Sequence, residues 1–324
     1  MKNYEQLINY FEHQLEAQNF SGEPGELYEP ISYTLGYGGK RIRPVLTLMA
    51  CELFCGDAER ALQQSIAIEL FHNFTLIHDD IMDNAPIRRG KETVYRKWNG
   101  NIAILSGDTL FALAYQHAQQ ANKEILYDIL SVFNQTAIEV CEGQQFDLNY
   151  ETNNLVSVDE YINMIRLKTG VLFGASLKIG ALIGGASIAE ADNLYQFGVN
   201  IGLGFQLKDD LLDTFGNESI FGKKTGGDIV TNKKTFLYIK ALECSDAPTQ
   251  QRLVYLYNMV EIDAATKIKE VKAIFNRLEI EKMTTNEIEK FYSRGMEFLD
   301  KVNIDEKNKE ILRDVASKMV EREK

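Results

Sequence analysis

Residues 125–140, ILYDILSVFNQTAIEV, carry apolar side chains at intervals of three and four positions. Ile125, Ile129 and Phe133 recur at the spacing that puts side chains on one face of an α-helix. A similar spacing runs through residues 102–114, with polar side chains between the apolar ones. The pattern predicts amphipathic helices that each bury one face.

Proline, which breaks helices, is rare after the first 90 residues. Four of the five prolines fall in the first 90 residues, and the chain then runs without proline to Pro248. Alternating apolar and polar runs of the kind that form strands are scarce. We therefore predict an all-α protein with ten or more long helices. No break between them has the length or composition of a linker, so we expect one domain over residues 1–324.

The charge balance excludes some partners. The formal net charge is −12, with 25% charged residues. An acidic chain of this kind argues against a nucleic-acid surface and against a polybasic membrane patch. Because the overall field repels anions, an anionic substrate must be captured by local basic residues or by metal.

Cysteine usage and apolar runs indicate a cytoplasmic protein. None of the four cysteines forms a CxxC pair, and reduced thiols are expected of Cys51, Cys55, Cys141 and Cys244. The N-terminus shows no long apolar run, so no signal peptide is indicated. Residues 171–189 are long enough to span a membrane, but they carry Lys178 and many small side chains. We interpret this segment as a buried helix of a bundle, with no transmembrane segment.

Two runs place the same cluster of carboxylates at two points of the chain. They are Asp79-Asp80-Ile81-Met82-Asp83 and Asp209-Asp210-Leu211-Leu212-Asp213. In each run the outer aspartates are four residues apart, so on a helix they project from one face. Each run abuts apolar sequence, so neither is a simple solvated acidic face. Mg²⁺, which favours one or two carboxylates together with substrate phosphate, would relieve the repulsion.

Basic residues cluster close to these runs. The turn Gly38-Gly39-Lys40-Arg41-Ile42-Arg43-Pro44 leads into a helix and offers N–H groups and cations to a diphosphate. Arg88 and Arg89 follow the first acidic run, and an arginine can bind two phosphate oxygens at once. Lys168 lies in the segment Lys168-Thr169-Gly170, which interrupts a helix. Lys223, Lys224 and Lys233 flank a glycine-rich loop after the second run.

Metal with two groups of cations implies two diphosphate-bearing substrates. The residues beside both runs are apolar, which suggests that a hydrocarbon follows the diphosphate; they are Phe71, Phe74, Leu76, Ile77, Met82, Leu207, Leu211 and Phe215.

Six ordered motifs resemble those of one family. They are GGKRIRP, HNFTLIHDDIMDNAPIRRG, LSGDTLF, GQQFDL, KTG, and GFQLKDDLLDTFG followed by GKKTGGDI. Together they resemble the trans-isoprenyl diphosphate synthases, or polyprenyl synthetases, which include the farnesyl and geranylgeranyl diphosphate synthases. The resemblance implies the isoprenoid synthase fold, a bundle of about ten core helices around a deep central cavity, paired as a homodimer.

The resemblance also implies residue roles. Three Mg²⁺ ions on the allylic diphosphate would be held by Asp79, Asp80, Asp83 and Asp209, and through water by Asp210 and Asp213. Contacts to that diphosphate would come from Arg88, Lys168, Lys223 and, on closure, Lys233. Isopentenyl diphosphate would be bound by Lys40, Arg43, His72 and Arg89. Gln206 and the Lys168–Thr169 carbonyls would face the developing carbocation, and Gln144 and Asp147 match a motif that supports the metal site.

The expected reaction is prenyl transfer without a side-chain nucleophile. Metal and cations stabilise the departing pyrophosphate, and an apolar cavity protects the allylic cation from water. Isopentenyl diphosphate then attacks the cation, and a proton is lost to pyrophosphate.

Two alternatives to this function stay open. A class I terpene cyclase also uses DDxxD, but it has a different second metal motif and lacks the GGKRxR site. A non-catalytic helical subunit of a heteromeric prenyl synthase usually loses aspartates that this chain keeps.

Two features depart from some relatives. Only two residues separate Asp80 from Asp83, where many bacterial farnesyl synthases have four. The tail Glu321-Arg322-Glu323-Lys324 only loosely resembles the basic tail that covers the site in some relatives.

Product length depends on the helix that ends at Asp79. Thr75 lies one turn below Asp79, with Phe74 beside it, and Phe71 lies two turns below. In the family, an aromatic at the Phe74 position acts as a floor, while a second aromatic at the Thr75 position shortens products further. Phe74 with a small Thr75 suggests a fifteen- or twenty-carbon product, and we favour twenty. The alternative is that Phe74 is ordinary core.

Overall fold

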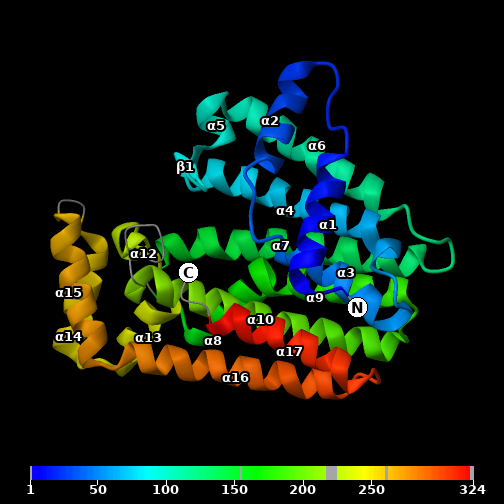
Figure 1. Cartoon of the computed structure of the whole chain (residues 1–324). Helices are drawn as coiled ribbons and strands as arrows, with labels where there is room; N and C mark the ends of the chain where they lie inside the picture. Colours follow the sequence, from blue (N-terminus) through cyan, green and yellow to red (C-terminus); the bar gives the residue numbers. More distant parts are fainter. Residues whose placement is uncertain (1, 154, 217–224, 260–261, 322–324) are drawn as a thin grey trace. The chain divides into compact units, whose positions relative to one another are not determined.

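The computed structural model describes residues 2–153, 155–216, 225–259 and 262–321. Within these ranges the regular secondary structure is helical apart from one short hairpin, which confirms the predicted all-α class (Figure 1). The chain divides into two compact units, Met1–Gln135 with Ala175–Leu194, and Thr136–Gly174 with Tyr195–Lys324. We call them unit 1 and unit 2. That the whole chain acts as one domain stays a prediction.

Unit 1 is built mainly on the N-terminal helices. Its elements are α1 (Tyr4–Glu16), α2 (Gly25–Leu35), α3 (Ile42–Cys55), the short turn η1 (Ala58–Ala61), α4 (Leu62–Met82), strands β1 (Ile87–Arg88) and β2 (Lys91–Glu92), α5 (Val94–Lys97) and α6 (Gly100–Ala118). Helix α4 packs against both α3 and α6. Its buried apolar residues, from Ile66 to Ile77, form the centre of this unit's core.

Unit 2 holds the C-terminal helices. Its elements are α8 (Val158–Ile165), the π-helical turn η2 (Arg166–Gly170), α12 (Gly227–Val230), α13 (Phe236–Cys244), α14 (Ala247–Asn258), α15 (Ala264–Arg277), α16 (Ile280–Asp300) and α17 (Glu306–Glu321). Three long helices contribute residues to both units, namely α7 (Leu126–Thr152), α9 (Val171–Gly184) and α10 (Ile188–Phe215).

Glycines let the buried helix α9 approach its neighbours closely. In unit 1, a Cβ atom on Gly184 would lie 2.7 Å from the Cys51 carbonyl oxygen of α3. In unit 2, a Cβ atom on Gly174 would lie 2.8 Å from the Tyr195 carbonyl oxygen of α10. The stretch Val158–Gly184 is apolar and long enough to cross a membrane, but 83% of its most apolar window is buried within the protein. The predicted buried helix over residues 171–189 is confirmed for α9, which ends at Gly184, so the prediction placed its end five residues too late.

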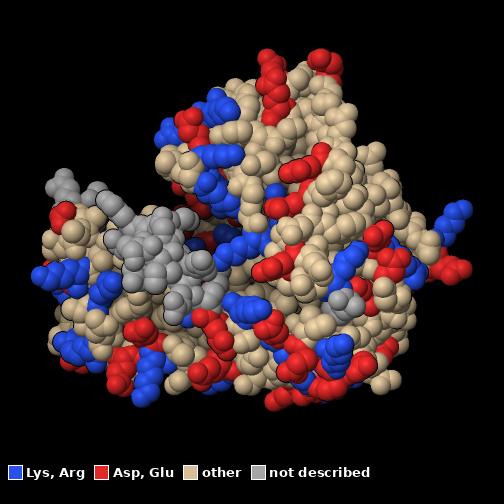
Figure 2. Space-filling model, viewed as in Figure 1, with Lys and Arg blue, Asp and Glu red and all other residues tan. Residues whose placement is uncertain are grey.

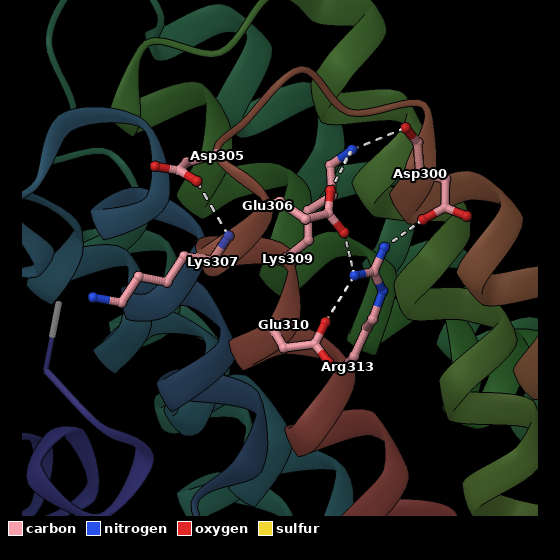
Figure 3. A network of polar contacts seen from close by, with 7 residues as sticks. All are labelled: Asp300, Asp305, Glu306, Lys307, Lys309, Glu310 and Arg313. Carbon is pink, nitrogen blue, oxygen red and sulfur yellow. Dashed lines mark hydrogen bonds and ion pairs between the residues drawn. The ribbon is translucent and has the colours of Figure 1, made fainter.

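Helices α16 and α17 lie side by side and are tied by one arginine (Figures 1 and 3). Arg313 donates to Asp300 at 2.7 Å and to Glu310 at 2.8 Å, and it also contacts Glu306. Acidic and basic side chains are interspersed over these two helices (Figure 2). Exposed pairs of this kind each contribute little stability, so burial of the apolar faces holds α16 and α17 in place.

A glycine in α7 sets the distance between α7 and η2. A Cβ atom on Gly143 would lie 2.7 Å from the Lys168 Cα and 2.8 Å from the Leu167 carbonyl carbon, both of them backbone atoms. We expect Gly143→Ala to lower the free energy of unfolding by about 1–3 kcal/mol, because the turn must move away from the new methyl group. Denaturant titration measures the change.

The matched control is Gly100→Ala at the first residue of α6. No atom lies within 4 Å of a Cβ placed there. This variant should be as stable as the parent or slightly more stable, because alanine is the better helix former. Equal destabilisation by both substitutions would contradict the close approach of α7 and η2.

Candidate active site

The glycine turn before α3 adopts a backbone that side chains disfavour. Gly38 and Gly39 have φ angles of 72° and 146°, and Arg41 caps α3 in the left-handed region at φ 47°. A Cβ atom on Gly39 would lie 2.8 Å from the Arg89 guanidinium carbon, and Arg89 also donates to the Gly38 carbonyl. The predicted phosphate-binding turn therefore has Arg89 packed on its backbone, with Lys40 exposed beside it.

Arg41 anchors the same turn from inside. Its guanidinium is buried, contacts the buried Glu69 carboxylate of α4 and donates to the Leu35 carbonyl at 2.8 Å. Asn73 donates to the same Glu69 carboxylate at 3.1 Å. A buried, paired charge of this kind costs several kcal/mol if one partner is removed, so it fixes the turn against α4.

Arg43 and His72, both expected to bind isopentenyl diphosphate, lie close together. The Arg43 Nη1 lies 3.5 Å from the His72 Nε2. Burial, followed by the positive charges of Arg43, Arg89 and Arg88, holds the pKa of His72 well below its ordinary value. His72 is therefore neutral at physiological pH and can donate one N–H to an anion.

A hairpin that the sequence did not predict presents the two arginines. Arg89 and Gly90 have φ angles of 50° and 77°, which is the geometry of a two-residue hairpin turn of type I′, with Arg88 paired to Lys91. The Tyr37 hydroxyl, in the turn that follows α2, donates to the Glu92 carbonyl at 2.7 Å and holds β2 in place. No sequence pattern indicates this hairpin, because a strand of two residues is too short to show alternation.

The first acidic run ends α4 with its middle carboxylate buried. Asp80 is 3% exposed and accepts from the Arg88 Nε at 2.7 Å. Burial raises the pKa of Asp80 to about 6, with Asp79 and Asp83 adding to the effect and Arg88 opposing it. Asp79 is partly exposed and Asp83, the C-cap, is exposed. Three like charges share the end of one helix.

The second run in α10 repeats this arrangement with different partners. Asp210 is 2% exposed, contacts the Tyr161 hydroxyl of α8 and accepts from the Gln206 amide at 3.1 Å. Burial and the neighbouring Asp228 raise the pKa of Asp210 well above its ordinary value. Asp209 and Asp213 are partly exposed.

Asp213 also has a structural role. Its carboxylate accepts from the Asp228 backbone N–H at 2.9 Å, and its carbonyl accepts from the Gly226 N–H at 2.6 Å. These bonds satisfy N–H groups at the start of α12. Burial raises the pKa of Asp228 as well, with Lys233 opposing the rise and Asp213 adding to it.

The predicted helix interruption at Lys168–Gly170 is the π-helical turn η2, a form that frequently marks functional sites. The Lys168 ammonium donates to Asp147 of α7 at 2.6 Å. Thr169 donates to the Gln206 side-chain oxygen at 3.1 Å, so Thr169, Gln206 and Asp210 form one chain of hydrogen bonds.

The remaining predicted residues fall into two groups. Lys233 belongs to unit 2, where its charge helps to hold the pKa of Asp147 below its ordinary value and opposes the rise that burial causes in the pKa values of Asp210 and Asp228. Gln144 is buried in α7, one turn before Asp147. Lys223 and Lys224, and the tail residues after Glu321, lie outside the described residues.

Phe71 and Phe74 belong to an aromatic cluster in unit 1. Their ring centroids are 5.6 Å apart, and Phe111 of α6 lies 5.9 Å from Phe71 and 5.0 Å from Phe74. Phe133 of α7 lies 5.5 Å from Phe71. Thr75 donates to the His72 carbonyl at 2.8 Å. From the sequence we identified only the two phenylalanines of α4, because no motif in α6 or α7 indicates that Phe111 and Phe133 contact them.

Sequence reasoning also missed polar partners of the predicted residues. Tyr161 and Glu69 read as ordinary members of amphipathic helices, and only tertiary contacts show that they hold Asp210 and Arg41. Asp228 lies in the GKKTGGDI motif, so that motif was the signal that could have identified it.

The donor set fits a hard divalent cation. Both runs offer carboxylate oxygens. In the first run, burial raises the pKa of Asp80, and repulsion from Asp79 and Asp83 adds to the rise. Among the described residues, no group of three or more His, Cys, Asp or Glu side chains is arranged to hold a metal ion by itself. Mg²⁺ is usually held by one or two carboxylates, with water and substrate phosphate completing its shell.

Comparison with known proteins matches these features to one family. The profile described as polyprenyl synthetase matches residues 24–278. The geranylgeranyl diphosphate synthase of Methanosarcina mazei is 43% identical over 222 residues, which cover 68% of this chain and 68% of that protein. The short chain isoprenyl diphosphate synthase of Methanocaldococcus jannaschii is 41% identical over 241 residues, which cover 74% of this chain and 73% of that protein.

The fold agrees with a solved structure as well. A crystal structure of a geranylgeranyl pyrophosphate synthase superposes with a TM-score of 0.95 at 42% identity and covers 99% of both chains.

The buried Asp80 predicts a pH dependence of stability in metal-free buffer. Its folded-state pKa, about 6, lies above the ordinary value near 4, so the folded protein binds more protons between these two values. The protonated Asp80 carboxyl therefore makes its full contribution to the free energy of unfolding below a pH of about 4, and this contribution is lost as the pH rises through about 6. Relative to the parent, Asp80→Asn should gain about 1–3 kcal/mol in free energy of unfolding between these limits.

Denaturant titrations across this pH range measure the difference between the two proteins. Asp314→Asn, which removes an exposed carboxylate of α17, is the matched control and should follow the parent at every pH. If Asp80→Asn also followed the parent, the Asp80 carboxyl would have an ordinary pKa.

Proposed function

Because the chain belongs to the polyprenyl synthetase family and is a trans-prenyltransferase, we propose that it condenses isopentenyl diphosphate with an allylic diphosphate head-to-tail. Dimethylallyl, geranyl and farnesyl diphosphate are the allylic substrates. The product is a short-chain all-trans prenyl diphosphate, which we assign as geranylgeranyl diphosphate. The observation that carries the proposal is the repeated acidic run with a buried middle carboxylate and a partner beside it.

Two sets of cations divide the two substrates. Arg88, Lys168 and Lys233 would contact the allylic diphosphate, with Lys223 as a further ligand. Isopentenyl diphosphate would bind to Lys40, Arg43, His72 and Arg89. Support comes from the close approach of Arg43 to His72 and from the packing of Arg89 on the glycine turn.

Three Mg²⁺ ions are expected per active site, held by Asp79, Asp80, Asp83 and Asp209, and through water by Asp210 and Asp213. When bound, they would supply positive charge to the departing diphosphate. The buried Asp80 and Asp210 would orient the runs, since each carboxylate is already held by neighbouring side chains.

The protein's own residues would then control ionisation and coupling. Lys168, Lys233 and Arg88 would stabilise the negative charge that develops on the leaving diphosphate. The Gln206 side-chain oxygen, oriented by Thr169, would face the allylic cation. Apolar side chains of α4 would exclude water from that cation. The released diphosphate would accept the proton lost in the coupling.

The two alternatives are not favoured. A class I terpene cyclase would need neither a second DDxxD run nor the GGKRIRP turn, and this chain has both. A non-catalytic subunit usually loses aspartates from these runs, and all six are present here.

We also propose that the enzyme is a cytoplasmic homodimer. None of the described cysteines is in a disulfide bond, as expected in a reducing compartment. Helix α6 exposes Ile104 and Leu105, and an apolar hollow of about 430 Å³ lies between Leu105 and Leu27. Apolar surface of this kind favours pairing, and sedimentation measures the mass of the particle.

The central test is product formation. Incubation of the purified protein with Mg²⁺, farnesyl diphosphate and isopentenyl diphosphate should yield a twenty-carbon prenyl diphosphate. Asp79→Ala and Asp209→Ala should each reduce turnover by at least about 1,000-fold, because loss of metal-held charge removes several kcal/mol of transition-state stabilisation. Helicity and melting temperature should stay close to those of the parent.

Asp192→Ala, an exposed aspartate near the start of α10, is the control and should keep parental turnover. Full activity of either variant in the acidic runs would refute the role of that run. A cyclic hydrocarbon product would instead support the cyclase alternative.

The aromatic cluster gives the product-length prediction. If Phe74 closes the floor of the hydrocarbon site, Phe74→Ala should lengthen the main product by at least one five-carbon unit, because the removed ring leaves room for a longer tail. Chromatography of the dephosphorylated products measures the change. Phe291→Ala in α16, also a partly buried phenylalanine, should leave the length unchanged. An active Phe74→Ala variant with unaltered products would place the floor elsewhere.

A further inference from the structure

Lys234 is bound at the C-terminal end of α7. Its ammonium donates to the carbonyls of Tyr150 at 2.9 Å, Glu151 at 2.9 Å and Asn153 at 2.6 Å. An ammonium has three protons, so these acceptors use all of them. The carbonyls at a helix C-terminus have no partners within the helix and carry partial negative charge, which favours a cation there. Lys234 therefore joins its own segment to α7.

A second anchor lies two residues before Lys234. Lys267 of α15 is only 2% exposed, contacts the side-chain oxygen of Asn232 and lies 5.2 Å from the centroid of the Tyr257 ring. Asn232 has a φ angle of 62°, in the left-handed region. A nearly buried lysine is costly unless its charge is paired or hydrogen-bonded, so this contact fixes Asn232.

The residue between the two anchors is Lys233. Its backbone N–H donates to the Asp228 carbonyl at 2.8 Å, and its carbonyl accepts from the Thr235 N–H at 3.0 Å. Its charge acts on Asp147, Asp210 and Asp228, all of which belong to unit 2. The backbone on both sides of Lys233 is thus held by the side chains of Lys234 and Lys267. In the described contacts, neither of these side chains binds to the three carboxylates.

We propose that Lys234 and Lys267 are positioning residues that hold the Lys233 ammonium beside the carboxylates of α7, α10 and α12. The role rests on the proposed function, in which Lys233 binds the diphosphate of the allylic substrate. Lys234 connects Lys233 to the end of α7, and Asp147 of the same helix pairs with Lys168. Lys168 and Lys233 are therefore placed by one helix.

Preorganisation explains why a flexible lysine would need two anchors. A lysine side chain loses on the order of 1.5–2 kcal/mol of conformational free energy when it is ordered. If its backbone is already fixed, less ordering remains for the moment of substrate binding. The neighbours of Lys233 thus carry part of that cost in the folded state.

The test measures binding of magnesium pyrophosphate by calorimetry, which needs no turnover. Lys234→Met keeps side-chain length and removes the charge; we expect binding to weaken about 5- to 30-fold, and Lys233→Met to weaken it at least as much. The double variant should bind no more weakly than Lys233→Met alone, because both changes act through one ammonium. In the prenyl transfer assay, KM for the allylic diphosphate should rise more than KM for isopentenyl diphosphate.

Controls separate positioning from general loss of structure. Lys240→Met removes an exposed ammonium of α13 that pairs only with Glu243 in the described contacts, and it should bind pyrophosphate like the parent. Lys234→Arg, which can still donate to the α7 carbonyls, should recover most of the binding. If Lys234→Met fails to fold, Lys267→Met replaces it. We expect Lys267→Met to weaken pyrophosphate binding as well, and we expect no further weakening when it is combined with Lys233→Met.

Two results would overturn the proposal. One is unchanged pyrophosphate binding in a folded Lys234→Met or Lys267→Met variant. The other is a double variant whose loss equals the product of the two single losses, which would mean that Lys234 acts independently of Lys233. Because binding is measured without turnover, these outcomes stand apart from the product assay that tests the prenyltransferase itself.

Discussion

The burial of one carboxylate in each acidic run is the constraint on which the candidate site depends. Asp80 and Asp210 are 3% and 2% exposed, and each is the middle aspartate of its run. A buried charge is tolerated only where it is paired or hydrogen-bonded. Arg88 supplies that partner in unit 1, and Tyr161 with Gln206 supplies it in unit 2. The outer aspartates are thereby presented on the more exposed side of the same helix ends.

The same constraint extends to the elements around each run. In unit 1, Arg88 pairs with Asp80 from the first strand of a tight hairpin that turns at Gly90 with positive φ, and Tyr37 holds the second strand. In unit 2, Asp213 fixes the start of α12, and α12 leads to Lys233. Each run therefore organises the cation-bearing segment that follows it in the sequence. A metal–diphosphate site needs this coupling, because its cations and carboxylates must be placed together.

Cations in an acidic protein need internal carboxylates to hold them before substrate arrives. Asp147 pairs with Lys168 and interacts with Lys233; burial alone would raise its pKa, yet these two lysines hold the pKa of Asp147 below its ordinary value. The pairing keeps both ammonium groups ordered in a chain whose net charge is −12. An incoming diphosphate would then meet oriented charges, which stabilise a transition state better than charges that must reorganise.

The sequence by itself determined the helical class, both acidic runs and the glycine turn. These features are local: helical spacing, proline and glycine placement, and clusters of charge act over a few neighbouring residues. The family resemblance rested on the same motifs, and the match over residues 24–278 confirms it.

Only the tertiary structure decided which aspartate of each run is buried and what holds it. Tyr161 is 49 residues from Asp210, and Lys234 is 84 residues from Tyr150. The hairpin at Ile87–Glu92 was also beyond the sequence pattern, since strands of two residues have no period to read. Partners so far apart are chosen by the packing of whole helices, which removes water from particular polar groups and requires a specific neighbour to replace it.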